Sequence, residues 1–581
     1  MAARTVVSWD TETRGLDWWD KDQQAFLATW SDGKGTYVAR HDKPVEVACF
    51  RDALLSATDL VAHNLSFDVH QTRESFGIDV LELDARLHDT ELLSRVLHPE
   101  GQNKNVQGGH TLKNLAKVYL RSDAKDSEDN IKQLAKSIGL RTLQQNGAYY
   151  EVWRAYPAEL ETYALLDAEY TYALFLMLES QLKLPENARL KSIYELECAV
   201  APVLIRAEQR GVALDPHATN KLLAMYIAEE QTTEQQLTAA LGEGIVGEGS
   251  HSKLREALLA YGIPLYRKTP SGQLATSQYA LQEFAADYPI IETLSNWRTA
   301  AKFRATYLGP IQDVTTVHTS YMQIGAWTGR MSCRRPNLQN IPKTAGREVR
   351  EVFVPRPNHA FVVCDYDAIE IRVLAYYLGD IGYRQLIDDG LDPHSWMAAQ
   401  IHGGNPDDYA KGTDGENLRT QAKETLFSIV YGAGAPRVSD MNQITITEAK
   451  DLIKKIKSSL PGYWTLQKRV RAKIEKDGYV STIMGRKQVV NSDKSYVGMN
   501  ALIQGSAADI MKSGLVNVAK AVDELKAYVL LVVHDEVVVE VPKEVADECL
   551  IRTEQALIDA YDLSPKLAVT GKVVTTNYAD A

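Results

Sequence analysis

Hydrophobic residues recur with different periods along the chain, and these changes mark the predicted elements. Residues 1–40 alternate between apolar and polar positions, which predicts strands, and a helical period follows to about residue 185. Residues 188–300 and 366–475 are mostly compatible with helices. Further strand-like segments lie at 317–324 and 360–365, with a predicted β-hairpin at 528–541. This order of elements predicts a multidomain α/β chain.

Two glycine-rich stretches interrupt the helical segments. Residues 101–110 are rich in Gly and Asn and predict a long loop, and the four glycines of 242–249 predict a flexible tip. The chain has 581 residues, more than one hydrophobic core usually serves, so we expect several structural units.

Two apolar runs each end on a carboxylate. The run 361–364 leads into Asp365, and the run 529–533 leads through His534 into Asp535 and Glu536. Both runs have the composition of buried strands, where an ionised group is costly unless it is paired or binds a metal. On adjacent strands, Asp365 and Asp535 would hold two hard divalent cations between them. Paired cations of this kind catalyse in-line phosphoryl displacement.

A second set of acids lies near the N-terminus. Asp10 and Glu12 stand two residues apart in a predicted strand, so their side chains share one face. Asp68 adds a third acid, and Tyr163 and Asp167, four apart in a helical run, bring a phenol and a fourth acid together. Four converging acids would form a second two-metal site, in which one metal activates a water for hydrolysis. A lone Asp-x-Glu pair is more often structural.

Between the two acidic strand ends lies a cationic helical segment. Arg419, Lys423, Phe427 and Tyr431 are spaced by four, so they form one drifting stripe on an α-helix. Two cations followed by two aromatic rings suit a nucleotide, with the cations on the phosphates and the rings on sugar and base. The alternative is an amphipathic core helix with a charged start.

Charge is unevenly distributed along the chain. The net charge of −12 argues mildly against a polyanionic partner. Basic residues nevertheless gather at 330–350 and 468–487, and the two clusters include Arg330, Arg469, Arg471 and Arg486. A basic cleft in an acidic body is one interpretation, and a solvated helix face is the other.

The remaining composition narrows the setting. Five scattered cysteines show no metal-type spacing, which is typical of a reducing compartment. No apolar run reaches membrane-spanning length, and no secretory signal precedes the first acidic motif. We therefore expect a cytoplasmic protein without a membrane partner.

The motifs together resemble those of family A DNA polymerases, the group of bacterial DNA polymerase I and its phage relatives. The N-terminal acids and Tyr163 resemble the DnaQ-like (DEDD, Tyr-subtype) 3′–5′ exonucleases. The matching polymerase segments are Thr328–Ser332, Pro336–Pro342, Asp365–Glu370, Asp392–His394, Arg419–Gly432, Asn500–Gly505 and His534–Glu536.

This resemblance implies a ribonuclease-H-like exonuclease domain followed by a right-hand polymerase with an antiparallel palm sheet. The expected ranges are 1–185 for the exonuclease, 186–315 for the thumb, 316–400 for the first part of the palm, 401–495 for the fingers and 496–581 for the second part of the palm. No 5′-nuclease domain is expected ahead of the exonuclease.

The resemblance also implies roles at the polymerase site. Asp365, Asp535 and the backbone carbonyl of Tyr366 would bind two Mg²⁺ ions, for which Mn²⁺ can substitute, with Glu536 in support. The exonuclease acids Asp10, Glu12, Asp68 and Asp167 would bind a second pair, and Tyr163 would orient the water. The implied deoxynucleotide contacts are Arg419, Lys423, His394, Phe427, Tyr431 and Glu370, where Lys423 would protonate the departing pyrophosphate and Glu370 would exclude a ribose 2′-hydroxyl.

The implied DNA contacts form another set. Minor-groove readers of base-pair shape would be Arg330, Asn500 and Gln504, and further contacts would come from Arg469, Arg471 and Arg486.

Two positions stand out within the motifs. Phe427 stands where some phage relatives carry Tyr, which implies discrimination against dideoxynucleotides. Asp367 stands where the family usually has Ser; its carboxylate either perturbs the metal site or points away from it.

We therefore expect a template-directed DNA polymerase with proofreading, acting as a monomer on primer–template DNA and deoxynucleoside triphosphates. Phage replication is the first interpretation, with helicase and single-strand-binding protein as partners and the host cytoplasm as the location. A bacterial or organellar repair polymerase is the second. Alternatives of other classes are a 3′–5′ exonuclease with a DNA-gripping C-terminal module and a non-catalytic DNA-binding scaffold.

Overall fold

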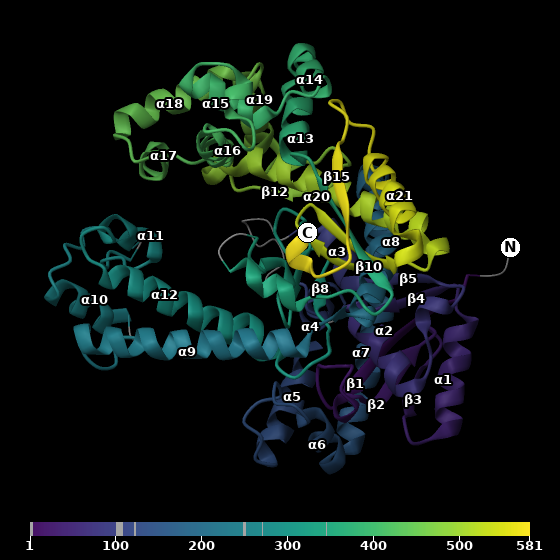
Figure 1. Cartoon of the computed structure of the whole chain (residues 1–581). Helices are drawn as coiled ribbons and strands as arrows, with labels where there is room; N and C mark the ends of the chain where they lie inside the picture. The colour runs from purple at the N-terminus through teal and green to yellow at the C-terminus, as the bar shows by residue number, and fades with distance from the viewer. Residues whose placement is uncertain (1–3, 100–108, 121–123, 248–250, 270, 344–345) are drawn as a thin grey trace.

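The computed structural model describes residues 4–99, 109–120, 124–247, 251–269, 271–343 and 346–581 (Figure 1). Most of the loop predicted at 101–110 lies outside these ranges, as does the end of the glycine-rich tip predicted at 242–249. Within them, no helix is both long enough and apolar enough to cross a lipid bilayer.

The N-terminal part is built on a five-stranded mixed sheet in the order β3-β2-β1-β4-β5. β1 pairs antiparallel with β2 and parallel with β4. The strands are β1 (Val6–Thr13), β2 (Ala25–Ser31), β3 (Thr36–Arg40), β4 (Asp59–Ala62) and β5 (Arg86–Asp89). The strands predicted within residues 1–40 are thus confirmed.

Alternate residues of β1 face opposite layers of helices. Val7 and Trp9 pack in a core with Val69 and Phe76 of α2 (Leu65–Phe76). On the other face, the hydroxyl of Ser8 donates to the carbonyl of Ala168 in α7 (Pro157–Leu182) at 2.7 Å. The remaining helices of this part are α1 (Pro44–Ser56), α3 (Thr90–Leu97), α4 (Leu112–Tyr119), α5 (Ala124–Ser137) and α6 (Ala148–Ala155).

The second large sheet has the order β13-β14-β10-β15 and is antiparallel throughout. Its strands are β10 (His359–Tyr366), β13 (Tyr528–Val533), β14 (Glu536–Pro542) and β15 (Val569–Val574). The predicted hairpin is confirmed as β13 and β14. His534 and Asp535 form its two-residue turn, and His534 has a left-handed φ of 59°. Such a φ is strained for a residue other than glycine and is common where a turn aims a functional side chain.

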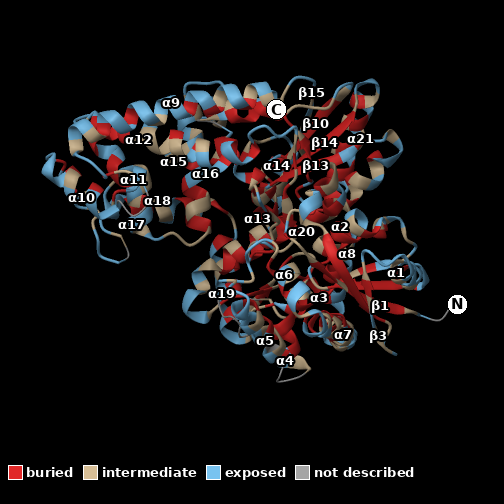
Figure 2. Ribbon diagram, turned by 90° about the horizontal axis from the view of Figure 1, so that it is seen from below, coloured by how far each residue is buried: buried red, intermediate tan, exposed pale blue. Residues whose placement is uncertain are grey.

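Three helices pack around this sheet. α21 (Ala546–Ile558) packs on β10 and β15, α8 (Ala188–Arg210) packs on β13, and α20 (Gly498–Val522) packs on both helices. Strands β10, β13 and β14 are mostly buried in Figure 2, whereas β15 is mostly half-buried or exposed. Because side chains alternate along β10, every second residue faces α21 and the residues between them face the other side of the sheet.

Two groups of helices extend from this sheet in Figure 1. One is an elongated arm of α9 (Pro216–Leu241), α10 (His251–Ala260), α11 (Gln278–Leu281) and α12 (Ile290–Lys302). The other comprises α13 (Ile369–Leu378), α14 (Ile381–Asp388), α15 (Pro393–His402), α16 (Glu416–Val430), α17 (Ala435–Asn442), α18 (Ile446–Ser459) and α19 (Tyr463–Asp477). Short strands complete the fold: β6 (Val212–Ala213), β7 (Thr316–Val317), β8 (Ser320–Met322), β9 (Ser332–Arg334), β11 (Tyr479–Ser481) and β12 (Lys487–Val489).

Candidate active sites

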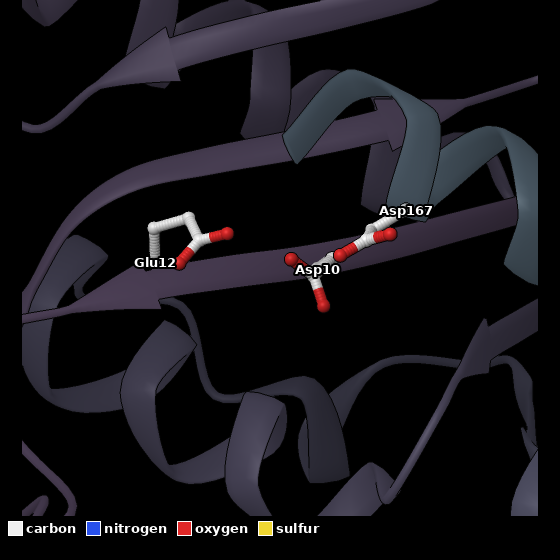
Figure 3. A group of neighbouring side chains, drawn as sticks. All are labelled: Asp10, Glu12 and Asp167. Atoms are coloured by element: carbon white, nitrogen blue, oxygen red, sulfur yellow. The ribbon is translucent and has the colours of Figure 1, made fainter. Parts of the chain in front are cut away.

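Three of the predicted N-terminal acids converge. Asp10 and Glu12 project from the same face of β1, and Asp167 reaches them from α7 (Figure 3). Each offers a carboxylate oxygen within 4.8 Å of the other two. Three oxygen ligands at this spacing form a donor set suited to a hard divalent cation.

Asp68 lies beside this cluster on the opposite layer. β1 pairs with β4 only through Ser8, so the backbone N–H of Thr11 is free to donate to Asp68 Oδ1 at 2.9 Å. The Thr11 hydroxyl donates to the same oxygen at 2.7 Å. Asp68 thus fills the place that a longer β4 would occupy, next to Asp10 and Glu12.

Burial sets the electrostatics of these acids. Desolvation, followed by the neighbouring Asp68 carboxylate, holds the pKa of Asp10 well above its ordinary value. Desolvation and Asp167 raise the pKa of Glu12 to about 8, and desolvation raises that of Asp68 to about 8. Burial favours the protonated, uncharged form of these acids. A bound cation would stabilise the ionised form instead, as expected of a metal site.

A lysine that the sequence analysis missed lies inside the cluster. Lys113 of α4 donates to Asp167 Oδ1, and its ammonium lies 4.0 Å from the centre of the Tyr163 ring. Lys113 and Asp167 are both only 8% exposed at the side chain. The sequence carried no signal for this contact, because Lys113 and Asp167 are 54 residues apart.

A cavity of about 750 Å³ opens beside the acids. Glu12 and Tyr149 line it near the cluster. Its other lining residues include four cations: Arg14, Lys132, Lys136 and Arg141. A mainly cationic cavity next to a carboxylate cluster can hold the anionic end of a single strand.

The acids of the second sheet also converge. Asp365 stands directly opposite Glu536 in the pairing of β10 with β14, and the N–H of Tyr366 donates to the carbonyl of Asp535 at 3.2 Å. The Tyr366 hydroxyl donates to the carbonyl of Leu557 in α21 at 2.7 Å. Tyr366 therefore faces α21, and the alternation turns Asp365 to the opposite face of the sheet.

Asp365 and Asp535 act on each other electrostatically. Desolvation and the Asp535 carboxylate raise the pKa of Asp365 to about 7. Lys343, also missed in the sequence analysis, lies 3.5 Å from Asp365 Oδ2 and 3.0 Å from Glu536 Oε2. Oδ1 of Asp365 is buried and has no hydrogen-bond partner among the described residues. The two aspartates therefore lie close enough to interact, and their role as metal ligands stays a prediction.

The predicted cationic helix is α16, and α15 packs beside it. Arg419 Nε donates to Asp392 Oδ2 at 2.5 Å. Burial raises the pKa of Asp392, but the hydrogen bond from Arg419 overrides it and the pKa lies at about 2. Burial and Lys423 lower the pKa of His394 to about 4, so this imidazole is neutral at pH 7.

The aromatic end of the stripe is also in place. The ring of Phe427 lies 5.8 Å from that of His394 and 5.6 Å from that of Tyr431, with which it stacks. His394 Nδ1 and the Tyr431 hydroxyl are buried and unpartnered within the described ranges. Buried polar atoms are usually hydrogen-bonded, so these two atoms indicate a ligand surface.

Glu370 connects α16 to the aspartates. Arg330 pairs with it directly. Burial raises its pKa, Arg330 and Lys423 act to lower it, and Asp535 acts to raise it. Lys423 of α16 and Asp535 of the hairpin turn thus both act on the Glu370 carboxylate, which places the two residues within electrostatic range of one site.

The predicted DNA contacts divide into three groups. Asn500 and Gln504 lie one turn apart on α20, half-buried, and Asn500 Oδ1 is buried without a partner among the described residues. Arg469 and Arg471 lie on α19, where Arg471 pairs with Glu475 at 2.8 Å. These residues are available for DNA, and their roles stay predictions.

The structure corrects the prediction that Arg486 contacts DNA. The prediction placed it on a DNA-binding surface, but its side chain is only 5% exposed and pairs with Glu197 at 2.5 Å and with Asp509 at 2.6 Å. Lys512 also pairs with Glu197 at 2.5 Å. Two carboxylates occupy the Arg486 guanidinium inside the protein, so we assign it to the packing of α8 against α20.

The Asp367 carboxylate either perturbs the metal site or points away from it, and its contacts bear on this choice. Its carboxylate accepts from the Thr570 hydroxyl at 2.9 and 3.0 Å. Thr570 belongs to β15, on the side of β10 away from β14 and the hairpin turn. This contact favours the interpretation in which Asp367 is directed away from Asp535.

Comparison with known proteins identifies two matching families. A family model described as "DNA polymerase family A" matches residues 217–580, more than half of the chain, and one described as "3'-5' exonuclease" matches residues 1–183. DNA polymerase I of Rhizobium leguminosarum is 30% identical over 89% of this chain and 50% of its own length. DNA polymerase I of Pseudomonas aeruginosa is 29% identical over 94% of this chain and 60% of its own length.

The chain thus spans about half to three-fifths of the length of these relatives. A solved structure, "POL domain of Pol1 from M. smegmatis complex with DNA primer-template and dNTP", matches with a TM-score of 0.81 at 24% identity. It covers 100% of this chain and 96% of that one, a likeness that shows the fold. The chain therefore belongs to DNA polymerase family A, with a 3′–5′ exonuclease domain ahead of its polymerase domain.

Proposed function

We propose that this chain is a template-directed DNA polymerase of the bacterial DNA polymerase I type, with proofreading by its exonuclease domain. The observation that carries the proposal is the convergence of Asp365 and Asp535 at one end of the β10–β14 pair, where desolvation and the Asp535 carboxylate raise the pKa of Asp365. A protein that only grips DNA has no use for two neighbouring acids, because like charges at close range destabilise each other. The intact α16 stripe supports the same conclusion.

The setting of this activity is repair in a bacterial cytoplasm rather than phage replication. The relatives reported above are bacterial DNA polymerase I enzymes, which supports the second of our interpretations over the first. Primer–template DNA and deoxynucleoside triphosphates are the proposed substrates, and the neighbouring Pol1 structure is described with both. The monomeric state and any helicase or single-strand-binding partner belong to the proposal.

At the polymerase site, each side chain has a distinct task. Asp365, Asp535 and the carbonyl of Tyr366 would hold Mg²⁺, which supplies Lewis-acid stabilisation of the charge on the α-phosphate. Arg419 and Lys423 bind the phosphates of the incoming nucleotide, and Lys423 can give a proton to the departing pyrophosphate. The primer 3′-oxygen attacks the α-phosphate, and catalysis consists mainly of positioning and charge neutralisation.

Neighbouring residues select the substrate. Phe427 and Tyr431 contact the sugar and base, and Glu370 closes the space of a ribose 2′-hydroxyl. Asn500 and Gln504 examine minor-groove acceptors that every correct base pair presents. Before substrate arrives, Asp392 holds Arg419 and Glu370 holds Arg330, so both cations are neutralised in the free protein.

At the exonuclease site, Asp10, Glu12 and Asp167 would hold divalent cations, with Asp68 beside them. The metal supplies an activated water for hydrolysis of the terminal phosphodiester. Tyr163 orients that water, and the cationic cavity beside Glu12 binds the single-stranded primer end. The exonuclease acids lie around β1, whereas Asp365 lies on β10 in a different sheet. The two activities are therefore independent.

Primer extension and primer degradation, measured side by side with Mg²⁺, test the proposal. Asp535→Ala should reduce extension by about 10³-fold or more, since losing a metal ligand removes several kcal/mol of charge stabilisation. Degradation of single strands should be unchanged. The double variant Asp10→Ala with Glu12→Ala should lose degradation and keep extension unchanged.

Two exposed acids serve as matched controls. Asp367→Ala near the polymerase motif and Glu159→Ala on α7 should leave both activities at the level of the unmodified protein. Extension that survives Asp535→Ala would refute the polymerase assignment. Continued trimming of a mismatched primer end by the double variant would refute the exonuclease assignment.

A further inference from the structure

Lys113 is a desolvated cation in the middle of the exonuclease acids. Its ammonium donates to Asp167 Oδ1 and lies 4.0 Å from the Tyr163 ring centre and 5.4 Å from that of Tyr170. One carboxylate and two aromatic faces therefore replace water around it, an arrangement that favours a bound cation.

The contact uses a carboxylate that the metal site needs. Asp167 is one of the three acids whose ligand atoms lie within 4.8 Å of one another. A lysine ammonium and a divalent cation on the same carboxylate repel each other, and a buried site screens that repulsion poorly. Lys113 and a metal thus compete for Asp167.

The helix that carries Lys113 is held independently of this contact. Leu112, Leu115 and Ala116 of α4 pack in a core with Tyr170 and Leu174 of α7. Freeing Asp167 would therefore require rotation of the Lys113 side chain about its own bonds, with α4 held in place.

We propose that Lys113 is a built-in counter-ion of the exonuclease site, which neutralises the acids when no metal is bound and is displaced from Asp167 when divalent cations enter. It is a positioning residue, and it sets the metal concentration at which degradation begins. The inference rests on the metal site of the proposed function and adds to it the residue that opposes metal binding.

The test is Mn²⁺ binding, followed by electron paramagnetic resonance in the full chain. Asp365→Asn with Asp535→Asn serves as the parent, so that the polymerase site does not contribute. In this parent, Lys113→Met should tighten Mn²⁺ binding at the exonuclease site by about tenfold, within the usual range of coupling between two ligands. Lys113→Arg, which keeps the charge, should stay close to the parent.

A matched control lies on the same helix. Lys117 is exposed, so Lys117→Met removes the same charge without touching the cluster and should leave the Mn²⁺ affinity unchanged. Thermal unfolding gives a second readout. In EDTA, Lys113→Met should melt below the parent, and saturating Mn²⁺ should close that gap.

The outcomes separate clearly. Equal Mn²⁺ affinity in the parent and in Lys113→Met, or a melting deficit that persists in saturating Mn²⁺, would overturn the inference and leave Lys113 as a packing residue. A Lys113→Met protein that folds only with Mn²⁺ would support it. A parent that binds no Mn²⁺ at the exonuclease site would refute the proposed metal site itself.

Discussion

Asp365 lies directly opposite Glu536 across the β10–β14 pair, with Asp535 in the turn immediately before Glu536. Opposite residues of an antiparallel pair share a face of the sheet, so Asp365 and Glu536 lie together, and the Asp535 carboxylate acts on Asp365 electrostatically. Lys343, half-exposed, is the cation closest to them among the described contacts. Proton binding and metal binding at Asp365 are consequently linked.

The first prediction concerns this linkage. Because the pKa of Asp365 is raised to about 7, metal must displace a proton from it below neutral pH. Mn²⁺ binding at the polymerase site should weaken by about tenfold between pH 8 and pH 6, since a group with a pKa of 7 is then about nine-tenths protonated.

Titration in an Asp10→Ala and Glu12→Ala background isolates the polymerase site. Asp367→Asn, which alters a carboxylate bound to Thr570, is the control and should show the same dependence. An affinity that is flat between pH 6 and pH 8 would mean that Asp365 is already ionised at pH 6 in the metal-free protein.

The second prediction concerns stability in the absence of metal. Glu12 and Asp68 have folded-state pKa values of about 8, above their ordinary values of 4.5 and 3.8. Between pH 5 and pH 8 the folded protein therefore holds more protons than the unfolded chain. The free energy of unfolding should therefore fall by several kcal/mol as pH rises through this window, because each of the two groups contributes about 1.36 kcal/mol for each unit of pKa shift.

Urea unfolding of the exonuclease domain within the full chain, in EDTA at pH 5, 6.5 and 8, measures this slope. Saturating Mg²⁺ should flatten it, because the bound cation stabilises the ionised acids. A free energy of unfolding that increases with pH in EDTA would show that the acids are ionised in the metal-free fold.

The third prediction concerns the buried ion pairs between α8 and α20. Glu197 accepts from both Arg486 and Lys512 at 2.5 Å, and all three side chains are at most 5% exposed. Glu197→Ala should destabilise the protein by about 3–5 kcal/mol, because it leaves two buried cations with only Asp509 to neutralise them.

The control is Glu195→Ala on the same helix. Its side chain is 63% exposed and pairs only loosely with Lys191 at 3.8 Å, so the expected change is below about 0.5 kcal/mol. Urea unfolding compares the two variants. Near-equal unfolding midpoints would return Arg486 to the DNA-binding role that the sequence predicted.

Local patterns were sufficient to predict both acidic clusters. The alternation of β1 put Asp10 and Glu12 on one face, and the apolar runs before Asp365 and Asp535 put these acids at strand ends. Spacing by four correctly predicted α16 with its stripe from Arg419 to Tyr431. These features depend on residues within a few positions of each other.

Features that depend on distant partners were beyond the sequence. Arg486 looked like part of a basic surface because its partner Glu197 lies 289 residues earlier in the chain. Lys113 and Asp167 are 54 residues apart, and Lys343 and Glu536 are 193 apart. A single sequence carries the charge of each residue but not the pairing that buries and neutralises it.

The fourth prediction concerns Phe427. Its ring stacks on Tyr431 beside His394, where the sugar of the incoming nucleotide would lie in the proposed site. Phe427→Tyr adds a hydroxyl that can replace the missing 3′-hydroxyl of a dideoxynucleotide. Incorporation of dideoxynucleotides should rise by about tenfold, as one hydrogen bond contributes about 1 kcal/mol or more.

Chain-termination efficiency against matched deoxynucleotides measures this selectivity, and extension with deoxynucleotides alone should be unchanged. A wild-type protein that already incorporates dideoxynucleotides as readily as Phe427→Tyr would show that Phe427 does not set the discrimination.

The last prediction concerns α19 as a DNA-binding surface. Arg469 and Arg471 are exposed, and Arg471 is only partly neutralised by Glu475, four residues on. If both contact phosphates, Arg469→Glu with Arg471→Glu should weaken binding to primer–template DNA. The slope of log affinity against log salt should become shallower by about 2, since each lost phosphate contact removes about 0.9 from it.

The control must change charge equally without removing an α19 contact. Lys450→Glu with Lys454→Glu reverses two cations on α18 and leaves α19 unaltered. Fluorescence anisotropy across a range of KCl concentrations gives both slopes. A shallower slope confined to the α19 variant would assign these arginines to the DNA. Equal slopes in the α19 variant and the wild type would identify them as a solvated helix face, because a solvated charge releases no counterions from DNA.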